Sequence, residues 1–181
     1  MNCTDLFEHI VSGEDTKACL QQLRKALKEM PASDIPASII DGSDVFVGLL
    51  SDSDPKIRQN AAHILGLLKV KGTEEALYSS YLRDETLYNK AAYLSALSGM
   101  DHSALDERLL QRRSELIAGT YEPDMKKHIG EELHELSLLL RASFPVHEFK
   151  SDGLVNECEL LTNRNFKQVT MKQVENIPHK E

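Results

Sequence analysis

The sequence has few of the features that mark secreted, membrane-bound or metal-stabilised proteins. Its three cysteines are widely separated and show no Cys-x-x-Cys spacing, which argues against a disulfide framework or a cysteine zinc site. No apolar run is long enough to span a bilayer. The acidic N-terminus lacks the basic and apolar regions of a secretory signal. We therefore expect a cytoplasmic protein with reduced thiols and no contact with a membrane.

Tryptophan is absent, and the formal net charge of −8 leaves no overall excess of basic residues. Phosphate binding needs a surface rich in Lys and Arg, and few aromatics leave few platforms for base stacking. Short basic runs are present at Arg24, Lys25 and Lys28, at Lys69 and Lys71, at Arg112 and Arg113, and at Lys126 and Lys127. We interpret them as solvated helix faces, with a local basic patch as the alternative.

Helical periodicity is the main pattern that the sequence does have, and it repeats. A helix is predicted over residues 55–68, where Asp54 suits an N-cap and Pro55 a first helical turn. About thirty residues later the pattern returns, with Ala61-Ala62 falling on Ala91-Ala92. A third, weaker copy begins at Pro123. The chain is therefore expected to contain an internal repeat.

Other predicted helices lie between these copies and complete antiparallel pairs. They cover residues 45–50, 73–82 and 104–118, and an upstream helix over 16–30 is expected to cap the open end of the stack. A loop bounded by Pro31 and Pro36 follows that upstream helix. Small residues let neighbouring helices approach closely, and we assign this role to Ala61, Ala62, Ala91, Ala92, Gly66 and Ala96. The predicted fold class is all-α: an α-α superhelix of stacked pairs in residues 1–143, with a short α/β-like tail in residues 144–181.

The pattern formed by Asp54, Pro55, Arg58, Ala61, Ala62, Leu65 and Gly66 resembles the HEAT-like repeat, particularly its short bacterial version. The resemblance covers roughly residues 33–141 and implies an armadillo-like solenoid. In that family the Arg position usually pairs with an Asp of a neighbouring repeat, so Arg58 is expected to be structural. The second repeat departs from the pattern by having Tyr88 at that position.

Equivalent positions on the second helix of each pair are expected to form one exposed face, because helices of a solenoid line up side by side. The equivalent sets are Gln59, Asn89 and Lys127, then Asn60, Lys90 and His128, then His63, Tyr93 and Glu131. We predict a non-catalytic interaction scaffold that binds a protein partner, or a downstream domain of its own chain, through this face. The predicted binding residues are Gln59, Asn60, His63, Asn89, Lys90, Tyr93, Lys127 and His134.

Tyr93 is predicted to be the strongest single contact, since an aromatic ring with a polar end suits an interface core. Ordinary packing against the next repeat is the alternative for Tyr93. Glu131 and His134 share one helix face, as ligands of di-iron bundles do. The comparable places carry Gln59-Asn60 and Asn89-Lys90, so no metal site is predicted.

No catalytic residue is predicted. The chain has no Gly-x-Ser-x-Gly turn and no glycine-rich phosphate loop, and its cysteines have no His at a motif spacing. No cofactor is therefore expected in this chain. A HEAT-like glycosylase acting on DNA lesions is disfavoured by the missing tryptophan and the acidic balance.

Helical periodicity ends after Pro145. Residues 157–162 predict a short strand and residues 163–165 a turn, and Thr170-x-x-Gln173 is typical of a helix capping box. The run from Cys158 to Phe166 resembles the opening strand and turn of THUMP-containing RNA methyltransferases that use S-adenosylmethionine.

That resemblance implies an alternative function: the N-terminal helical region of a larger RNA methyltransferase, with a truncated THUMP-like domain. In this alternative the full-length protein binds S-adenosylmethionine and RNA, and its reading frame continues past Glu181. A glycine-rich cofactor loop and an Asn/Asp-Pro-Pro-Tyr motif are both absent here, so no methylation is expected from this chain alone.

Overall fold

The computed structural model describes residues 2–142, which form helices and short 3₁₀ turns with no β-strand among them. The helices are α1 (Cys3–Ser12), α2 (Thr16–Glu29), α3 (Ala37–Asp41), α4 (Asp44–Leu49), α5 (Pro55–Leu68), α6 (Glu74–Arg83), α7 (Leu87–Leu97), α8 (Asp106–Ala118) and α9 (Pro123–Leu139). The predicted all-α class is confirmed for these residues. None of their helices is both long and apolar enough to cross a membrane.

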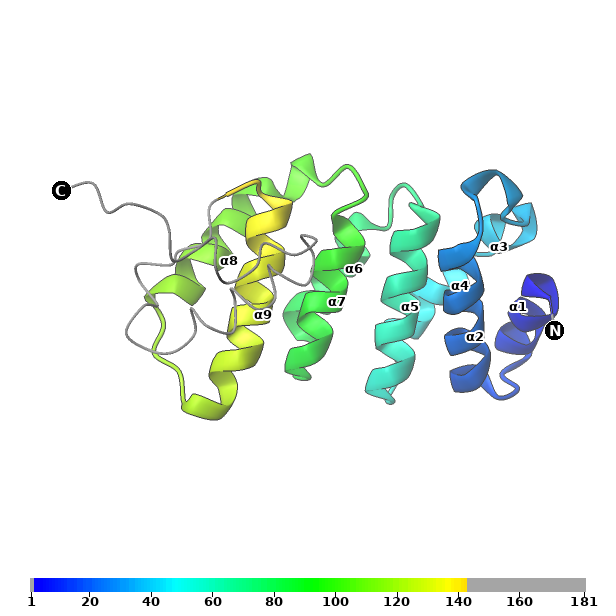
Figure 1. The fold of residues 1–181 in the computed structure, drawn as a ribbon, viewed down its shortest axis with the longest axis horizontal. Coiled ribbons are helices and arrows are strands. Elements are labelled where there is room, and N and C mark those ends of the chain that lie inside the picture. The colour runs from blue at the N-terminus through cyan, green and yellow to red at the C-terminus, as the bar shows by residue number, and fades with distance from the viewer. Residues whose placement is uncertain (1, 143–181) are drawn as a thin grey trace, which may run out of the picture.

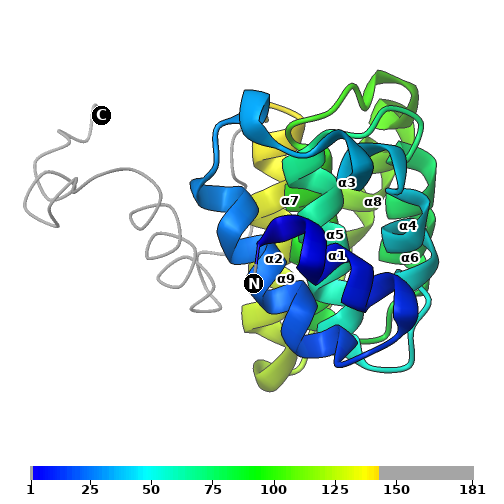
Figure 2. The ribbon, with the colours of Figure 1, turned by 90° about the vertical axis from the view of Figure 1, so that its right-hand side faces the viewer.

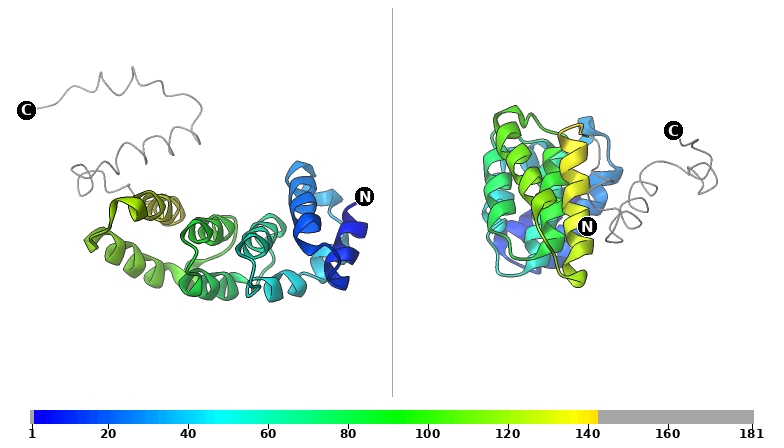
Figure 3. Two further views of the ribbon diagram at one scale, coloured as in Figure 1. Left: turned by 90° about the horizontal axis from the view of Figure 1, so that it is seen from below. Right: turned by 90° about the vertical axis from the view of Figure 1, so that its left-hand side faces the viewer.

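The helices lie in two rows that follow the order of the chain (Figure 1). In the inner row, α2 packs on α5, α5 on α7, and α7 on α9. In the outer row, α1, α4, α6 and α8 each pack on the inner helix that follows them, and Figure 2 shows the two layers. Seen from below, the rows form an arc with the inner row on its concave side (Figure 3). This arrangement is compatible with a helical repeat fold.

The inner helices α2 and α5 run in the same direction. Lys17 Nζ binds Asp54 Oδ2 at 2.8 Å, which joins the N-terminal ends of the two helices. Farther along, Arg24 Nη1 donates to Asn60 Oδ1 at 3.2 Å. The second contact uses a later residue on both helices than the first, so α2 and α5 are parallel.

The helices α5 and α7 are parallel by the same criterion, and they approach very closely near their C-terminal ends. Asn89 Nδ2 donates to the Pro55 carbonyl at 3.1 Å near both N-termini. Near the other end, a Cβ placed on Gly66 would lie 2.7 Å from Ala96 Cα. The predicted role of Gly66 and Ala96 in close helix approach is therefore confirmed.

The start of α5 is as the sequence predicts. The Asp54 side chain accepts a hydrogen bond from the Lys56 N–H at 2.7 Å, and Pro55 occupies the first turn. An N-cap of this kind satisfies a backbone donor that the helix leaves free.

The register of α7 differs from the predicted one. Because α5 begins at Pro55 and α7 at Leu87, the position of Ala61 corresponds to Tyr93 rather than to Ala91. The register taken from the alanine doublets is thus wrong by two positions. In the observed register Lys90, not Tyr88, stands where α5 has Arg58.

Residues 3–12 form a helix, α1, that is not among the helices predicted from the sequence. The Asn2 side chain accepts from the Asp5 N–H at 2.9 Å, and the Asp5 carboxylate accepts from the Asn2 N–H at 3.1 Å, which makes a capping box. Leu6 and Ile10 are buried, and α1 packs against α2. The helix α2 is therefore the second member of a pair and not an end cap.

Two connecting segments contain more structure than predicted. The loop between Pro31 and Pro36 holds a 3₁₀ turn, Ala32–Asp34, and is followed directly by α3. A second 3₁₀ turn, Ser103–Leu105, precedes α8, which begins at Asp106. The predicted strand, turn and capping box of the tail, and with them the THUMP-like resemblance, lie outside the described residues.

Candidate interaction surface

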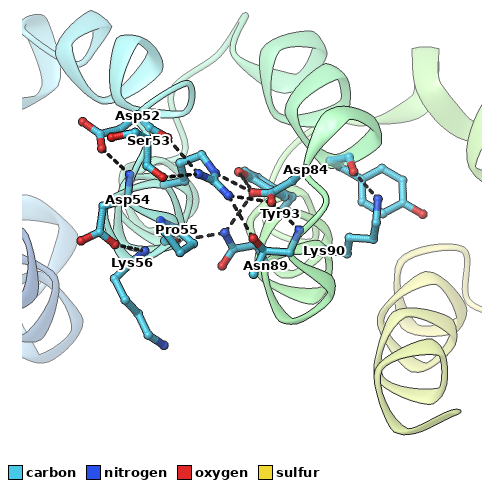
Figure 4. A network of polar contacts seen from close by, with 12 residues as sticks. Asp52, Ser53, Asp54, Pro55, Lys56, Asp84, Asn89, Lys90 and Tyr93 are labelled. Atoms are coloured by element: carbon cyan, nitrogen blue, oxygen red, sulfur yellow. Dashed lines mark hydrogen bonds and ion pairs between the residues drawn. The ribbon is translucent and has the colours of Figure 1, made fainter. Parts of the chain in front are cut away.

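An ion pair between Arg58 and Asp84 links α5 to the segment that precedes α7 (Figure 4). Arg58 Nε and Nη2 donate to the two carboxylate oxygens of Asp84, each at 2.8 Å. The third guanidinium nitrogen donates to the carbonyls of Asp52 and Ser53 at 2.9 and 3.1 Å. The expected structural role of Arg58 as the partner of an Asp beside the next inner helix is confirmed, and all three nitrogens of its guanidinium bind groups of the fold.

Asp84 is buried and accepts three further hydrogen bonds. They come from the Thr86 N–H at 2.8 Å, Asn89 Nδ2 at 2.9 Å and the Tyr93 hydroxyl at 2.8 Å. Burial alone would raise the pKa of Asp84, but the bonds from Arg58, Asn89, Thr86 and Tyr93 outweigh it and hold that pKa well below its usual range. Asp84 is therefore a carboxylate at neutral pH whose oxygens are occupied by the protein.

A second polar cluster joins α6, α7, α8 and α9. Lys90 Nζ donates to the Tyr81 carbonyl at 2.8 Å, and the Tyr81 hydroxyl donates to Glu132. Arg112 Nε also donates to Glu132, at 3.0 Å. Burial raises the pKa of Tyr81 and lowers that of Lys90. This cluster fixes α9 to the neighbouring helices.

Three of the predicted binding residues are buried in α7. Asn89 and Tyr93 are 0% exposed and Lys90 is 9% exposed. The expectation that they belong to an exposed face is therefore wrong. In the observed register these three residues face the packed interior, and their polar atoms bind Asp84 and Tyr81 there. For Tyr93, the alternative of ordinary packing describes its position.

The other predicted binding residues fall into two groups. Asn60 and His134 are also buried, so their expected exposure is wrong too. Asn60 Nδ2 donates to the carbonyl of Lys56, one turn earlier in α5, at 2.9 Å. Gln59 and His63 are half-buried and Lys127 is exposed, so these three are accessible from outside.

The motif of Glu131 and His134 does not form part of a metal site within residues 2–142. Glu131 contacts the His128 ring nitrogen Nδ1 at 3.3 Å instead. Within that same range no group of three or more His, Cys, Asp and Glu side chains is arranged to hold a metal ion. The imidazole of His134 is buried in α9, and its Nε2 has no hydrogen-bond partner there.

A groove of about 430 Å³ lies between α2 and α5 in the inner row. Seven residues line this α2–α5 groove: Gln21, Arg24, Lys25, Lys28, Lys56, Gln59 and Asn60. Four of them are basic. None of these four forms an ion pair with a carboxylate of residues 2–142.

Two cations of the α2–α5 groove, Arg24 and Lys56, have neutral partners. Arg24 donates to the Asn60 amide oxygen, and burial lowers the pKa of Arg24. Lys56 Nζ donates to Gln59 Oε1 at 3.2 Å and lies 4.6 Å from the centre of the Tyr88 ring. Neutral groups orient these side chains without cancelling their charge, so the groove remains positive.

The positive charge of the groove also acts on His63, which lies one turn beyond Gln59 on α5. Its burial, followed by the charges of Arg24 and Lys28, lowers the pKa of His63 to about 4. From the sequence alone, the basic run on α2 is interpreted as a solvated helix face, whereas in the structure it lines the groove. Nothing local indicates that this run faces Lys56 of α5, since that juxtaposition depends on how the two helices pack.

Comparison with known proteins identifies no relative: no protein-family model matches the chain, and no curated protein or solved structure is significantly similar to it.

Proposed function

We propose that residues 2–142 form a HEAT-like stack of helix pairs that serves as a non-catalytic scaffold and binds a protein partner, or a neighbouring domain, through the inner row. The observation that carries this proposal is the inner row itself. Its helices lie side by side on the concave side of the arc, and a groove opens between two of them whose four basic residues form no ion pair with a carboxylate of residues 2–142. Continuous faces of this kind are the usual binding surfaces of stacked helix pairs.

The polar networks support the proposal because they make the inner row rigid. The Arg58–Asp84 pair ties α5 to α7, and the Arg112–Glu132 pair ties α8 to α9. A surface that is already ordered loses less conformational entropy when a partner binds. The same networks engage the buried side chains of Asp84, Lys90 and Glu132, whereas Lys25, Lys28 and Lys56 of the α2–α5 groove remain exposed.

Site-specific photo-crosslinking in cells tests the proposal. A photoreactive amino acid at Gln59 or Lys127 reports on the inner row, and the same amino acid at exposed Leu110 of α8 is the matched control on the outer row. We expect a discrete protein adduct, or a crosslink to a neighbouring domain, from both inner positions and not from Leu110.

Equal crosslinking from Leu110, or no crosslink from either inner position, would contradict the scaffold function. Adducts with RNA in place of protein would favour the methyltransferase alternative.

A further inference from the structure

The α2–α5 groove has two facing stripes of polar side chains. On α2, Gln21, Arg24 or Lys25, and Lys28 recur at helical spacing and share one face. On α5, Lys56 and the Gln59-Asn60 pair do the same. The bond between Arg24 and Asn60 shows that the stripes face each other, and because the helices are parallel both stripes run along the groove.

The groove is positive within a chain of net charge −8. Two of its four cations, Arg24 and Lys56, have amide or aromatic partners, and the charges of Arg24 and Lys28 already disfavour a proton on His63. Like charges held together in this way repel one another, and an anion in the groove would relieve that repulsion. The positive charge of the groove therefore favours a negatively charged ligand.

We propose that the α2–α5 groove binds an extended acidic segment of a partner polypeptide. This inference rests on the proposed scaffold function and adds the position of the site and the chemistry of its ligand. From Gln21 to Lys28 the groove is roughly 10 Å long at the helical rise per residue. An extended peptide rises about 3.3 Å per residue, so three or four residues fill it.

The lining favours a peptide over a nucleic acid. The amides of Gln21 and Gln59 can donate to and accept from a peptide main chain, while the Lys and Arg side chains reach carboxylates. No aromatic side chain lines the groove, so bases would have no ring to stack on, and Tyr88 nearby has Lys56 over its face. A polyanion longer than the groove would also meet the net negative charge of the chain.

Fluorescence anisotropy with the full chain at low salt tests the inference, with a fluorescein-labelled hexaglutamate peptide as the probe. We expect saturable binding that the double variant K25E/K28E weakens by roughly tenfold or more, because two attractive contacts become repulsive. The matched control K71E makes the same kind of charge reversal on an exposed residue outside the groove, and we expect its Kd to stay within about twofold. Thermal unfolding of each variant confirms that the fold is retained.

A second readout follows His63 by NMR. Saturation with hexaglutamate should raise the pKa of His63 above its value of about 4, because the anion offsets the charges of Arg24 and Lys28. Hexaglutamine, which is neutral, should not bind and should leave the pKa of His63 unchanged.

Three results would overturn the inference: no saturable binding of hexaglutamate, an equal Kd for K25E/K28E and the unmodified chain, or tighter binding of a ten-nucleotide uridine RNA than of hexaglutamate. The scaffold function fails separately. If the crosslinks from Gln59 and Lys127 persist in K25E/K28E while hexaglutamate does not bind, the scaffold stands and the acidic-peptide site does not.

Discussion

Arg58 and Asp84 form a bidentate ion pair across the boundary between α5 and α7, with the Asp84 side chain 1% exposed and the Arg58 side chain 17% exposed. Both partners come from residues that precede or begin an inner helix. Bidentate pairs of this kind are geometrically specific as well as strong, so the pair defines how one inner helix is placed against the next.

Replacement of Arg58 by Leu should destabilise the protein strongly. It leaves the buried Asp84 carboxylate without its cation, and breaking a buried pair in this way costs about 3 kcal/mol. Urea unfolding followed by circular dichroism measures the change. Arg108→Leu is the matched control, because Arg108 and Glu75 form an exposed pair whose loss should hardly change the urea midpoint. Equal midpoints for the two variants would contradict the structural role of Arg58.

The stability that Asp84 contributes should depend on pH in the acid range. Its folded-state pKa lies below the unfolded value of about 3.9, so between those two values the unfolded chain binds more protons. The contribution of Asp84 is therefore complete well above the unfolded pKa and is lost as the pH falls below it. Urea unfolding of Asp84→Asn and the unmodified chain at several pH values should show a deficit at pH 7 that shrinks toward about pH 2.5. A deficit that stays constant with pH would refute this account.

Gly66→Ala should destabilise the stack although it adds only a methyl group. The new Cβ would meet the Ala96 backbone at 2.7 Å, so α5 and α7 must separate, and overpacking of this kind costs about 1–3 kcal/mol. Gly48→Ala is the control, since nothing lies within 4 Å of its added Cβ in α4. Because alanine favours helix more than glycine does, the change near the end of α4 should be neutral or stabilise by up to about 1 kcal/mol. Equal effects of the two substitutions on the free energy of unfolding would show that the helices are not in close contact at Gly66.

His63 should remain neutral down to a pH of about 4, as measured by the chemical shifts of its imidazole. Burial is the main cause and the charges of Arg24 and Lys28 add to it. Lys28→Gln removes one exposed charge without disturbing the core, and it should raise the pKa of His63 while leaving it below the ordinary 6.5. An unchanged pKa in Lys28→Gln would show that the groove does not act on His63.

Helix content and helix starts were largely predictable because local chemistry decides them. Asp54 and Pro55 mark the start of α5 as a cap and a first-turn proline, and the structure agrees. The capping box of Asn2 and Asp5, followed by buried Leu6 and Ile10, was equally readable and would have revealed α1. Local signals therefore suffice for most elements of this fold.

The register of α7 and the surroundings of its polar residues could not be read locally. The Ala91-Ala92 doublet suggested one register, whereas the helix start at Leu87 imposes another. Asn89 and Lys90 are polar residues that are usually exposed, and their burial is stabilised by Asp84 and Tyr81. Such partners are recognisable only when the packing of helices is known.

The parallel arrangement of α2, α5 and α7 gives the molecule an electrical polarity along the helix axes. Peptide dipoles that point the same way place partial positive charge along the edge where these helices begin, and side by side they repel each other. Asp52, Asp54 and Asp84 all stand at that edge (Figure 4). Their carboxylates thus act as counter-charges for the N-terminal ends of α5 and α7. The placement of these acidic residues therefore helps the two parallel helices to lie side by side.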